Sequence, residues 1–218
     1  GNSIMEYYAA TEGGGTIITA EEWLTKEGSV GRPWSGADVR IYDDEGHRLG
    51  AGEVGTIYMG LAQADFEYKG DQAKTKGNRI YEEDGAFFTV GDVGEIDEDG
   101  YLFLRDRKID MIISGGVNIY PSEIESTFTT NPTVGDVAVF GIPNDDWGEE
   151  VKAVIQPVEG TVADSAYEAA LREWADANLA SYKRPRSYDF TTEMPRDPSG
   201  KLYKRRLRDP YWEGRSQI

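Results

Sequence analysis

Lys201 ends a short turn, Pro198-Ser199-Gly200-Lys201, and its side chain is a candidate for catalysis. A lysine ammonium is a compact charge on a flexible stem, so a glycine turn can present it to negative charge that forms in a transition state. The stretch lacks the six-residue glycine spacing of a Walker phosphate loop. The plain alternative is a surface turn before a basic helix at Lys204-Arg205-Arg206.

Two carboxylates stand beside glycines in the first half of the chain. Glu12 follows Thr11 and precedes three glycines, and Asp92 follows Thr89-Val90-Gly91. A carboxylate such as that of Asp92 can accept two hydrogen bonds at once. Taken alone, Glu12 also fits an ordinary strand end, and Asp92 fits a charged surface turn.

A polar joint at Arg105-Asp106-Arg107-Lys108 leads into the apolar triplet Met111-Ile112-Ile113, which we expect to be buried. A Ser-Gly-Gly turn, a short strand and a helix opened by Pro121 follow, and the fixed φ of proline suits a first helical position. The double glycine permits a backbone path or a close ligand approach that a Cβ would block. This exposed joint before a new strand–loop–helix segment predicts the start of a second domain.

Residues 1–104 are predicted to be mostly β-structure. We expect Val39-Arg40-Ile41-Tyr42 to alternate between outside and inside, and a second strand to run from Val54 to Met59. Residues 60–85 show little periodicity, which predicts a surface loop with a short helix.

From about residue 110 the pattern changes to alternating helices and strands, which predicts a small α+β domain. The expected helices are 121–130 and 165–179, and the expected strands are 137–140, 151–157 and 187–191. The PRDPSGK loop and a short basic helix finish the chain. Ser165 and Glu168 are expected to form a capping box at the second helix. Its apolar stripe is predicted to comprise Ala170, Leu171, Trp174 and Leu179.

The composition indicates a folded, acidic chain. A hydrophobic content of 39%, with five Trp and thirteen Tyr among 218 residues, can form a core. The net charge of −17 argues against nucleic-acid binding, because phosphate backbones require a basic surface. Residues 183–218 nevertheless hold ten Lys or Arg against five Asp or Glu. This basic end favours a local anion site, and the plainer alternative is a solvated basic helix face.

No apolar run approaches the roughly 20 residues that a membrane span needs, and the start does not look like a signal peptide. We therefore expect no transmembrane segment and a cytoplasmic location, with which the absence of cysteine is compatible. The lone histidine, His47, lies in a DDEGHRLG turn and is expected to be a solvated loop residue.

Six segments in order resemble motifs of the adenylate-forming enzymes, the superfamily of acyl-CoA synthetases, luciferases and peptide-synthetase adenylation domains. They are YAATE at 8–12, GRPWSGADVRIYDDEG at 31–46, GEVGTIYMG at 52–60, TVGDVGEIDEDGYLFLRDR at 89–107, NPTVGDVAVFGIPNDDWGEEVKAVI at 131–155 and YKRPRSYDFTTEMPRDPSGKLYKRRL at 182–207. The segment RDRKIDMIISGGVNIYPSEIE at 105–125 resembles the domain junction of the same enzymes. Among them, the acyl-CoA synthetases are the most similar branch.

The resemblance implies an α+β fold in two parts. Residues 1–108 would be a β-rich remnant of the large N-terminal domain, and residues 109–218 the small, mobile C-terminal domain. The family's Gly/Ser/Thr-rich phosphate loop and most of its large domain would precede residue 1. We therefore expect the C-terminal part of a longer enzyme, whose missing N-terminal domain is a partner of this chain. The family pivot, usually Asp or Lys, falls at Ile109.

Adenylation joins a carboxylate to the α-phosphate of ATP and expels pyrophosphate, so the site needs a metal and cations aimed at the developing charge. By resemblance, Glu12 binds Mg²⁺, and Lys201 bridges the α-phosphate and the substrate carboxylate. The implied nucleotide-binding residues are Tyr8 for adenine stacking, Thr11 for phosphate, and Asp92 and Arg107 for ribose. Ala9 departs from the glycine that the family usually has.

In the second half-reaction the CoA thiol attacks the acyl-adenylate, after a rotation of the small domain that removes the lysine. Gly116 matches the glycine that lines the pantetheine tunnel, where a side chain would obstruct the thiol arm. The implied CoA-nucleotide residues combine aromatic rings with guanidiniums, which suit adenine and phosphate. They are Trp147, Tyr182, Arg184 and Arg186.

The resemblance thus implies an ATP-dependent acyl-CoA synthetase that forms acyl-CoA, AMP and pyrophosphate from ATP, CoA and a fatty or other bulky carboxylic acid. Mg²⁺ would be the cofactor, and this part of the enzyme alone is expected to be inactive. A homodimer is left open. The first alternative is an acyl-AMP ligase or adenylation domain that loads a carrier protein. The second is a non-catalytic nucleotide- or CoA-binding module.

Overall fold

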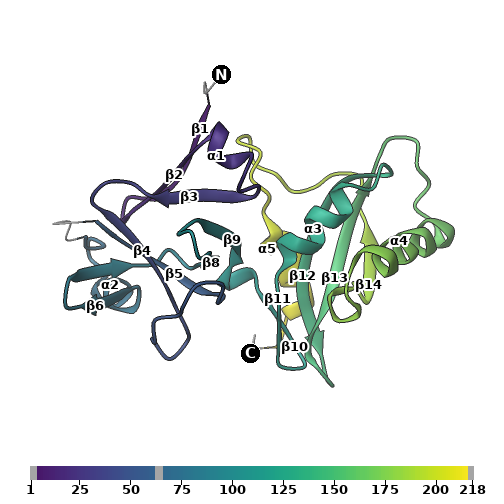
Figure 1. Cartoon of the computed structure of the whole chain (residues 1–218). Coiled ribbons are helices and arrows are strands. Elements are labelled where there is room, and N and C mark those ends of the chain that lie inside the picture. The colour runs from purple at the N-terminus through teal and green to yellow at the C-terminus, as the bar shows by residue number, and fades with distance from the viewer. Residues whose placement is uncertain (1–3, 62–65, 216–218) are drawn as a thin grey trace. The chain divides into compact units, whose positions relative to one another are not determined.

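The computed structural model describes residues 4–61 and 66–215. The chain divides into two compact units, Gly1–Ile109 and Asp110–Ile218 (Figure 1). Both units combine β-sheet with short helices, which confirms the predicted α+β class. Among the helices in the described ranges, none is long and apolar enough to cross a membrane.

Unit 1 is built on a sheet, as predicted for residues 1–104. Within the described residues, nine strands form this sheet in the order β1-β2-β3-β9-β8-β5-β7-β6, with β4 paired to β5. The strands are β1 Met5–Ala10, β2 Gly14–Thr19, β3 Ser29–Pro33, β4 Ala37–Tyr42, β5 Gly55–Leu61, β6 Arg79–Glu82, β7 Gly85–Phe88, β8 Asp92–Ile96 and β9 Leu102–Arg107. The helices are α1 Ala20–Trp23 and α2 Gln72–Gly77.

The predicted alternation at residues 39–42 is wrong, because all four side chains are buried. The guanidinium of Arg40 lies 4.0 Å from the centre of the Phe87 ring, and the Tyr42 hydroxyl donates to Glu82 at 2.8 Å. Both partners belong to the hairpin of β6 and β7. This hairpin covers the face of β4 that carries Arg40 and Tyr42, so neither face of the strand is left to solvent.

The same hairpin corrects the prediction for residues 60–85. The short helix is present as α2, but 79–82 and the first residue of β7 are strand rather than loop, and β5 also takes in residues 60–61. At four residues each, β6 and β7 are too short to show a periodic pattern. Residues 62–65 of the predicted loop lie outside the described residues.

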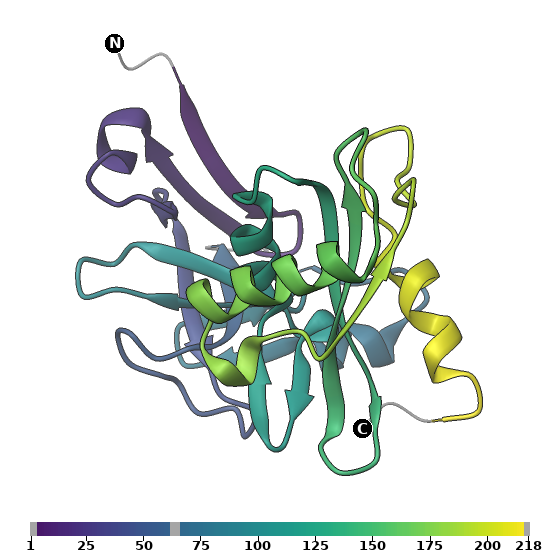
Figure 2. The same ribbon diagram turned by 90° about the vertical axis from the view of Figure 1, so that its right-hand side faces the viewer.

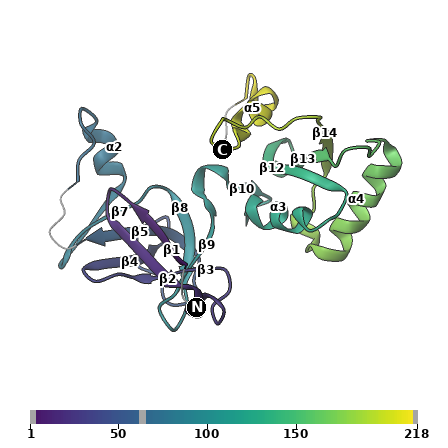
Figure 3. The ribbon, with the colours of Figure 1, turned by 90° about the horizontal axis from the view of Figure 1, so that it is seen from above.

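Unit 2 is a five-stranded sheet with helices on both faces; in Figure 3, α3 and α4 lie on one face and α5 on the other. The strand order is β11-β10-β13-β12, and β14 pairs in parallel with β13. The strands are β10 Ile112–Ser114, β11 Val117–Ile119, β12 Val134–Asn144, β13 Gly148–Pro157 and β14 Ser187–Phe190. The α-helices are α3 Pro121–Thr129, α4 Ser165–Asn178 and α5 Lys204–Arg208, and the 3-10 turns are η2 Ser181–Lys183 and η3 Asp209–Trp212.

The central strands of unit 2 are buried on both faces. Val137 and Val139 of β12 belong to the core that also contains α3 and α4 residues, whereas Ala138 and Phe140 belong to a second cluster with Met194. Strands covered on both faces are apolar at successive positions rather than at alternate ones. The strand predicted at 137–140 is therefore the buried middle of a longer strand.

Helix α4, drawn in light green in Figure 2, starts at Ser165 as the sequence predicts. Its cap differs from the prediction. The Asp164 carboxylate accepts the backbone N–H groups of Ala166 and Tyr167, both at 3.0 Å. Asp164 thus occupies the N-cap, which carboxylates favour, and the capping box predicted at Ser165 and Glu168 is wrong. The stripe is partly corrected as well, because Ala170 is exposed. The residues of the helix that are buried are Tyr167, Leu171 and Ala175.

Candidate functional site

Three residues predicted to bind the nucleotide lie together in unit 1. Asp92 opens β8, Arg107 ends β9, and the two form a register pair of this antiparallel ladder. Nε of Arg107 lies 3.3 Å from Oδ1 of Asp92. The hydroxyl of Tyr8, on β1, donates to Oδ2 of the same carboxylate at 2.6 Å. The sheet therefore brings the side chains of Tyr8 and Arg107 to the Asp92 carboxylate.

This carboxylate keeps capacity for a ligand. Each carboxylate oxygen can accept about two hydrogen bonds, and each oxygen of Asp92 takes one from these two neighbours. Burial, and then the hydrogen bond to Asp92, raise the pKa of Tyr8, so its hydroxyl remains a donor at neutral pH. The Arg107 side chain is 53% exposed, which leaves its guanidinium accessible to an anion.

Glu12 lies in the turn between β1 and β2 with hydroxyls around its carboxylate. Thr11 donates to Oε2 at 3.0 Å, and Tyr68 donates to Oε1 at 3.0 Å. Burial acts to raise the pKa of Glu12, but hydrogen bonds from its own backbone, Tyr68 and Thr11 outweigh burial and lower it. Tyr68 was missed by the sequence analysis, because it lies in the stretch without periodicity.

Close backbone approach requires the glycines of this turn. A Cβ on Gly13 would lie 2.2 Å from the carbonyl oxygen of Met59, and a Cβ on Gly15 would lie 2.1 Å from that of Tyr8. Gly15 is also the register partner of Ala9. The alanine that departs from the family pattern is accommodated because a glycine faces it.

Lys201, in unit 2, ends a loop whose polar groups hydrogen-bond to one another. Oδ1 of Asp197 accepts the Ser199 amide at 2.9 Å, the Ser199 hydroxyl at 2.6 Å and the Lys201 amide at 2.9 Å. Gly200 has a φ of 87°, a conformation that favours glycine. Lys201 is exposed, and among the described residues its ammonium has no hydrogen-bonding or ionic partner.

Most of the basic end is neutralised within unit 2. Seven of its ten cations form ion pairs with carboxylates, namely Lys183, Arg184, Arg196, Lys204, Arg205, Arg208 and Arg215. In the part of the chain that the structure describes, Arg186, Lys201 and Arg206 have no ionic partner. These three cations are therefore the candidates for the predicted anion site. Two of them, Arg186 and Lys201, are also predicted site residues.

Two of the predicted CoA residues form an aromatic–guanidinium pair. The Arg186 guanidinium lies 5.1 Å from the centre of the Trp147 ring, within the range of a cation–π contact. Trp147 is 48% exposed. A Cβ on Gly115 would lie 2.5 Å from a carbon of this ring, so Gly115 belongs to the site although only its neighbour was predicted. For Gly116 the requirement is its φ of 79°, since nothing lies within 4 Å of its Cβ position.

The other two predicted CoA residues are not part of this pair. Arg184 lines a pocket of about 530 Å³ with Arg186, but Nε of Arg184 donates to the Leu179 carbonyl at 3.0 Å and Nη2 to the Asp176 carbonyl at 2.9 Å. These bonds tie it to the end of α4. Tyr182 is exposed, and its described ring contact is with the Lys183 ammonium, at 5.5 Å.

Ile109, the predicted pivot, lies in the 3-10 turn η1 Lys108–Asp110, is 66% exposed and ends unit 1. Of the triplet 111–113 only Ile112 is fully buried, so the prediction for the other two is wrong. The reason is that β10 has three residues and meets β13 only at the pair of Ser114 and Gly148.

A buried carboxylate that the sequence analysis missed supports this short strand. Glu149, on β13, is 5% exposed, and its Oε2 accepts the backbone N–H of Ile113 at 3.0 Å. Burial raises the pKa of Glu149. Its position in an acidic pair, Glu149-Glu150, gives no signal that one of the two is buried.

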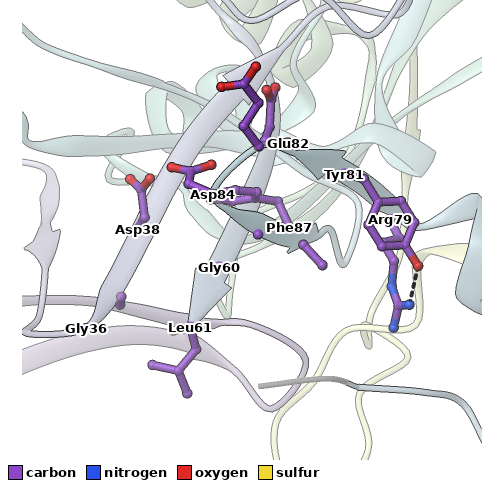
Figure 4. A pocket seen from close by; sticks show the side chains of 13 residues that line it. Gly36, Asp38, Gly60, Leu61, Arg79, Tyr81, Glu82, Asp84 and Phe87 are labelled. Carbon is purple, nitrogen blue, oxygen red and sulfur yellow. Dashed lines mark hydrogen bonds between the residues drawn. The ribbon is translucent and has the colours of Figure 1, made fainter. Parts of the chain in front are cut away.

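A groove of about 640 Å³ in unit 1 lies apart from the predicted residues (Figure 4). Figure 4 shows the carboxylates of Asp38, Glu82 and Asp84 around it, and Arg40 binds two of these, Asp38 and Asp84. None of the predicted site residues lines this groove. His47 is the solvated turn residue that was expected, with Nδ1 3.1 Å from Asp43.

Two protein-family models match this chain. Residues 1–64 match the AMP-binding enzyme model, and residues 123–201 match the AMP-binding enzyme C-terminal domain. The chain belongs to the adenylate-forming superfamily. The family that the sequence motifs predicted is thus confirmed.

Relatives within the adenylate-forming superfamily align with nearly the whole chain. A long-chain-fatty-acid–CoA ligase of Mycobacterium tuberculosis is 39% identical over 212 residues, which are 95% of this chain and 40% of the relative. A fatty acid–acyl-carrier-protein ligase of Streptomyces coeruleorubidus is 35% identical over the same shares, 95% and 40%. The structure of o-succinylbenzoate coenzyme A synthetase from Bacillus subtilis with ATP and magnesium ion has a TM-score of 0.78 at 27% identity, over 95% of this chain and 41% of that chain. The chain thus spans about 40% of the length of the curated relatives it matches.

Proposed function

We propose that this chain is the C-terminal part of an ATP-dependent acyl-CoA synthetase for a fatty or other bulky carboxylic acid. In the first step a carboxylate oxygen attacks the α-phosphorus of ATP, and the bond from that phosphorus to pyrophosphate breaks. In the second, the CoA sulfur attacks the acyl carbon and AMP leaves. Residues 1–108 would belong to the large domain and 109–218 to the small domain, with the pivot at Ile109.

The observation that carries the proposal is that Tyr8 and Arg107 both hydrogen-bond to the carboxylate of Asp92. Asp92 can accept both ribose hydroxyls of ATP with its remaining capacity. The hydrogen bond that Asp92 accepts from the Tyr8 hydroxyl orients the Tyr8 ring, which can then stack on adenine. The exposed Arg107 guanidinium can reach the ribose as well.

The residues present fit a magnesium ion. Glu12 and Thr11 offer a carboxylate and a hydroxyl side by side, and Mg²⁺ is commonly bound by one or two carboxylates together with substrate phosphates. The lowered pKa keeps Glu12 ionised at neutral pH. When bound, the ion would neutralise charge on the phosphates of ATP.

Lys201 would supply the mobile cation of the first step. Its ammonium is exposed and unpaired in the described structure, so binding a phosphate breaks no existing ion pair. Among the ten cations of the basic end, seven lack this freedom. An ammonium held near both reacting anions lowers the cost of bringing them together.

For the second step, Trp147 and Arg186 would hold the CoA nucleotide, and the open turn at Gly116 would pass the pantetheine arm. Tyr182 could join them on the surface, whereas Arg184 would first have to leave the end of α4. The relative that acts on an acyl-carrier protein supports a second candidate, in which the acceptor is the thiol of a carrier protein.

The test is to measure ATP–pyrophosphate exchange and AMP formation by the complete enzyme that contains this chain, against a panel of carboxylic acids. The proposal expects acid-dependent exchange and CoA-dependent AMP formation. Exchange with AMP formation that requires a carrier protein instead of CoA would favour the second candidate. The absence of exchange with every acid would leave a non-catalytic nucleotide-binding module. The isolated 218-residue chain is expected to show no exchange.

A further inference from the structure

Arg196 lies at the base of the loop that presents Lys201, and the proposed function gives it no role. Nε and Nη2 of Arg196 donate to Oδ2 and Oδ1 of Asp136, both at 2.8 Å. Nη1 donates to the backbone carbonyl of Gly200 at 2.7 Å. One planar guanidinium therefore joins strand β12 to the residue immediately before Lys201.

This arrangement is more specific than a surface ion pair. The contact with Asp136 is bidentate, which fixes the plane of the guanidinium. Asp136 is itself oriented, because its Oδ1 accepts the Val137 amide at 2.9 Å. With the plane fixed, the third donor of Arg196 points at a single place, the Gly200 carbonyl.

The ends of the loop are also anchored. Met194 is buried on the sheet, and Leu202 packs against the same apolar cluster. Arg196 and Leu202 form a β-bridge across the base of the loop. Between these anchors, Asp197 organises the turn internally and Arg196 ties it to β12. The backbone at Lys201 is thus fixed while its side chain remains free.

We propose that Arg196 and Asp136 form a clasp that positions Lys201 for adenylation. Both are positioning residues that act through Lys201 and need no contact with the substrate. This inference rests on the proposed role of Lys201 in the first half-reaction. The clasp lies entirely within unit 2, so it would travel with the lysine when that unit moves.

The test times both half-reactions in the complete enzyme for Arg196→Met and Asp136→Asn. Misplacing a catalytic group by about 1 Å can cost ~10²-fold in rate, so each variant should slow adenylation by ~10- to 100-fold. The KM values for ATP and acid should change by less than about threefold, and thioester formation from supplied acyl-adenylate by less than about threefold. Arg196→Lys should restore only part of the rate, since an ammonium cannot make the bidentate contact and also bind Gly200.

Epistasis with Lys201 separates positioning from general support of the fold. In a Lys201→Ala background, Arg196→Met should change the residual adenylation rate by less than about twofold, because the group it positions is gone. If the rate losses of Lys201→Ala and Arg196→Met multiply in the double variant, the clasp is overturned. An adenylation rate within twofold of wild type in Arg196→Met alone would overturn it as well. If Lys201→Ala itself leaves adenylation unchanged, the proposed role of Lys201 fails first.

Arg205→Met is the matched control. Like Arg196→Met, it removes one guanidinium from the basic end of the chain. The ion pair that Arg205 forms with Asp209 is long, at 3.7 Å, and exposed. This variant should leave both half-reactions within twofold of wild type. Hydrogen exchange of the Lys201 amide in the 218-residue chain gives a readout free of activity. Arg196→Met and Asp136→Asn should each speed it at least about fivefold, and unchanged exchange in both would overturn the clasp.

Discussion

The hydroxyl of Tyr8 and the carboxylate of Asp92, 84 positions apart in sequence, meet at 2.6 Å. Tyr8 lies on β1 near one edge of the sheet, and Asp92 begins β8 beyond β2, β3 and β9. The contact makes one unit of an aromatic ring and a carboxylate, which are the two groups that a nucleoside needs for its base and its ribose.

Asp92→Ala in the complete enzyme should raise the apparent KM for ATP. Losing two charge-assisted hydrogen bonds to ribose should cost roughly 2–4 kcal/mol, about 30- to 1,000-fold. The measurement is the rate of adenylation against ATP and against 2′,3′-dideoxy-ATP. Wild type should discriminate between them and the variant should not. Equal use of both nucleotides by wild type would contradict this role, while Tyr8→Phe should retain the discrimination.

Trp147→Ala and Arg186→Met should each raise the KM for CoA by about tenfold, since a cation–π or stacking contact contributes on the order of 1 kcal/mol or more. Adenylation should stay within twofold of wild type. With pantetheine as the acceptor, which lacks the nucleotide, variants and wild type should react alike. Tyr81→Ala breaks a comparable exposed aromatic–arginine contact in unit 1, with Arg79 at 5.4 Å, and should change neither reaction. An equal loss with pantetheine would contradict nucleotide binding by this pair.

Glu149 should make the stability of unit 2 depend on pH. Burial raises its folded-state pKa above the unfolded value of 4.5, so its contribution is most favourable below that value. The contribution is lost as pH rises through the folded pKa, because the unfolded state ionises first. Glu149→Gln keeps an acceptor for the Ile113 amide and removes this dependence, so it should gain stability relative to wild type as pH rises from 4 to 7.

Hydrogen exchange of buried β12 and β13 amides measures this for unit 2 alone. Glu149→Ala is the contrasting variant, because it leaves the Ile113 amide without its acceptor and should lose ~1–3 kcal/mol. An unchanged pH dependence in Glu149→Gln would contradict the raised pKa, because a group with equal pKa values in the folded and unfolded states adds no pH dependence to stability.

Tyr188→Phe should leave unit 2 as stable as wild type or up to ~1 kcal/mol more stable. Its hydroxyl is buried and has no hydrogen-bond partner in the described structure, and burial raises its pKa to about 12. Tyr167→Phe is a matched control, since both tyrosines are 8% exposed in the same core. The Tyr167 hydroxyl donates to the Thr133 carbonyl at 2.9 Å, so that variant should lose ~0.5–1.5 kcal/mol. Equal losses in both variants, measured by amide exchange, would reveal a partner for Tyr188.

Elements with strong local signals could be predicted from the sequence. The helix opened by Pro121 and the helix over 165–178 were found because apolar spacing and a first-position proline are local properties. The residue types of Tyr8, Asp92 and Arg107, which are candidates for nucleotide binding, were also visible. So were the glycine turn before Lys201 and the α+β class of unit 2. Motifs that resemble a known family carried the assignment of roles to those residues.

Other features depended on contacts between segments that are distant in sequence. The sequence predicted an alternation between outside and inside over residues 39–42, but the hairpin of β6 and β7 contacts Arg40 and Tyr42, and all four side chains are buried. The pairing of seven basic-end cations was equally invisible, because most of their partners lie on other elements.

The sequence by itself supplied the candidates for nucleotide binding and for a free cation, because residue types, local turns and family motifs are all visible along the chain. Only the tertiary structure decided which cations stay free and which carboxylate is buried. Lys201 and Lys204 have the same side chain three residues apart, yet Lys204 is bound to Glu125 at 2.8 Å and Lys201 has no ionic partner among the described residues. That difference arises because charge pairing depends on distance in space, which the register of strands and helices sets.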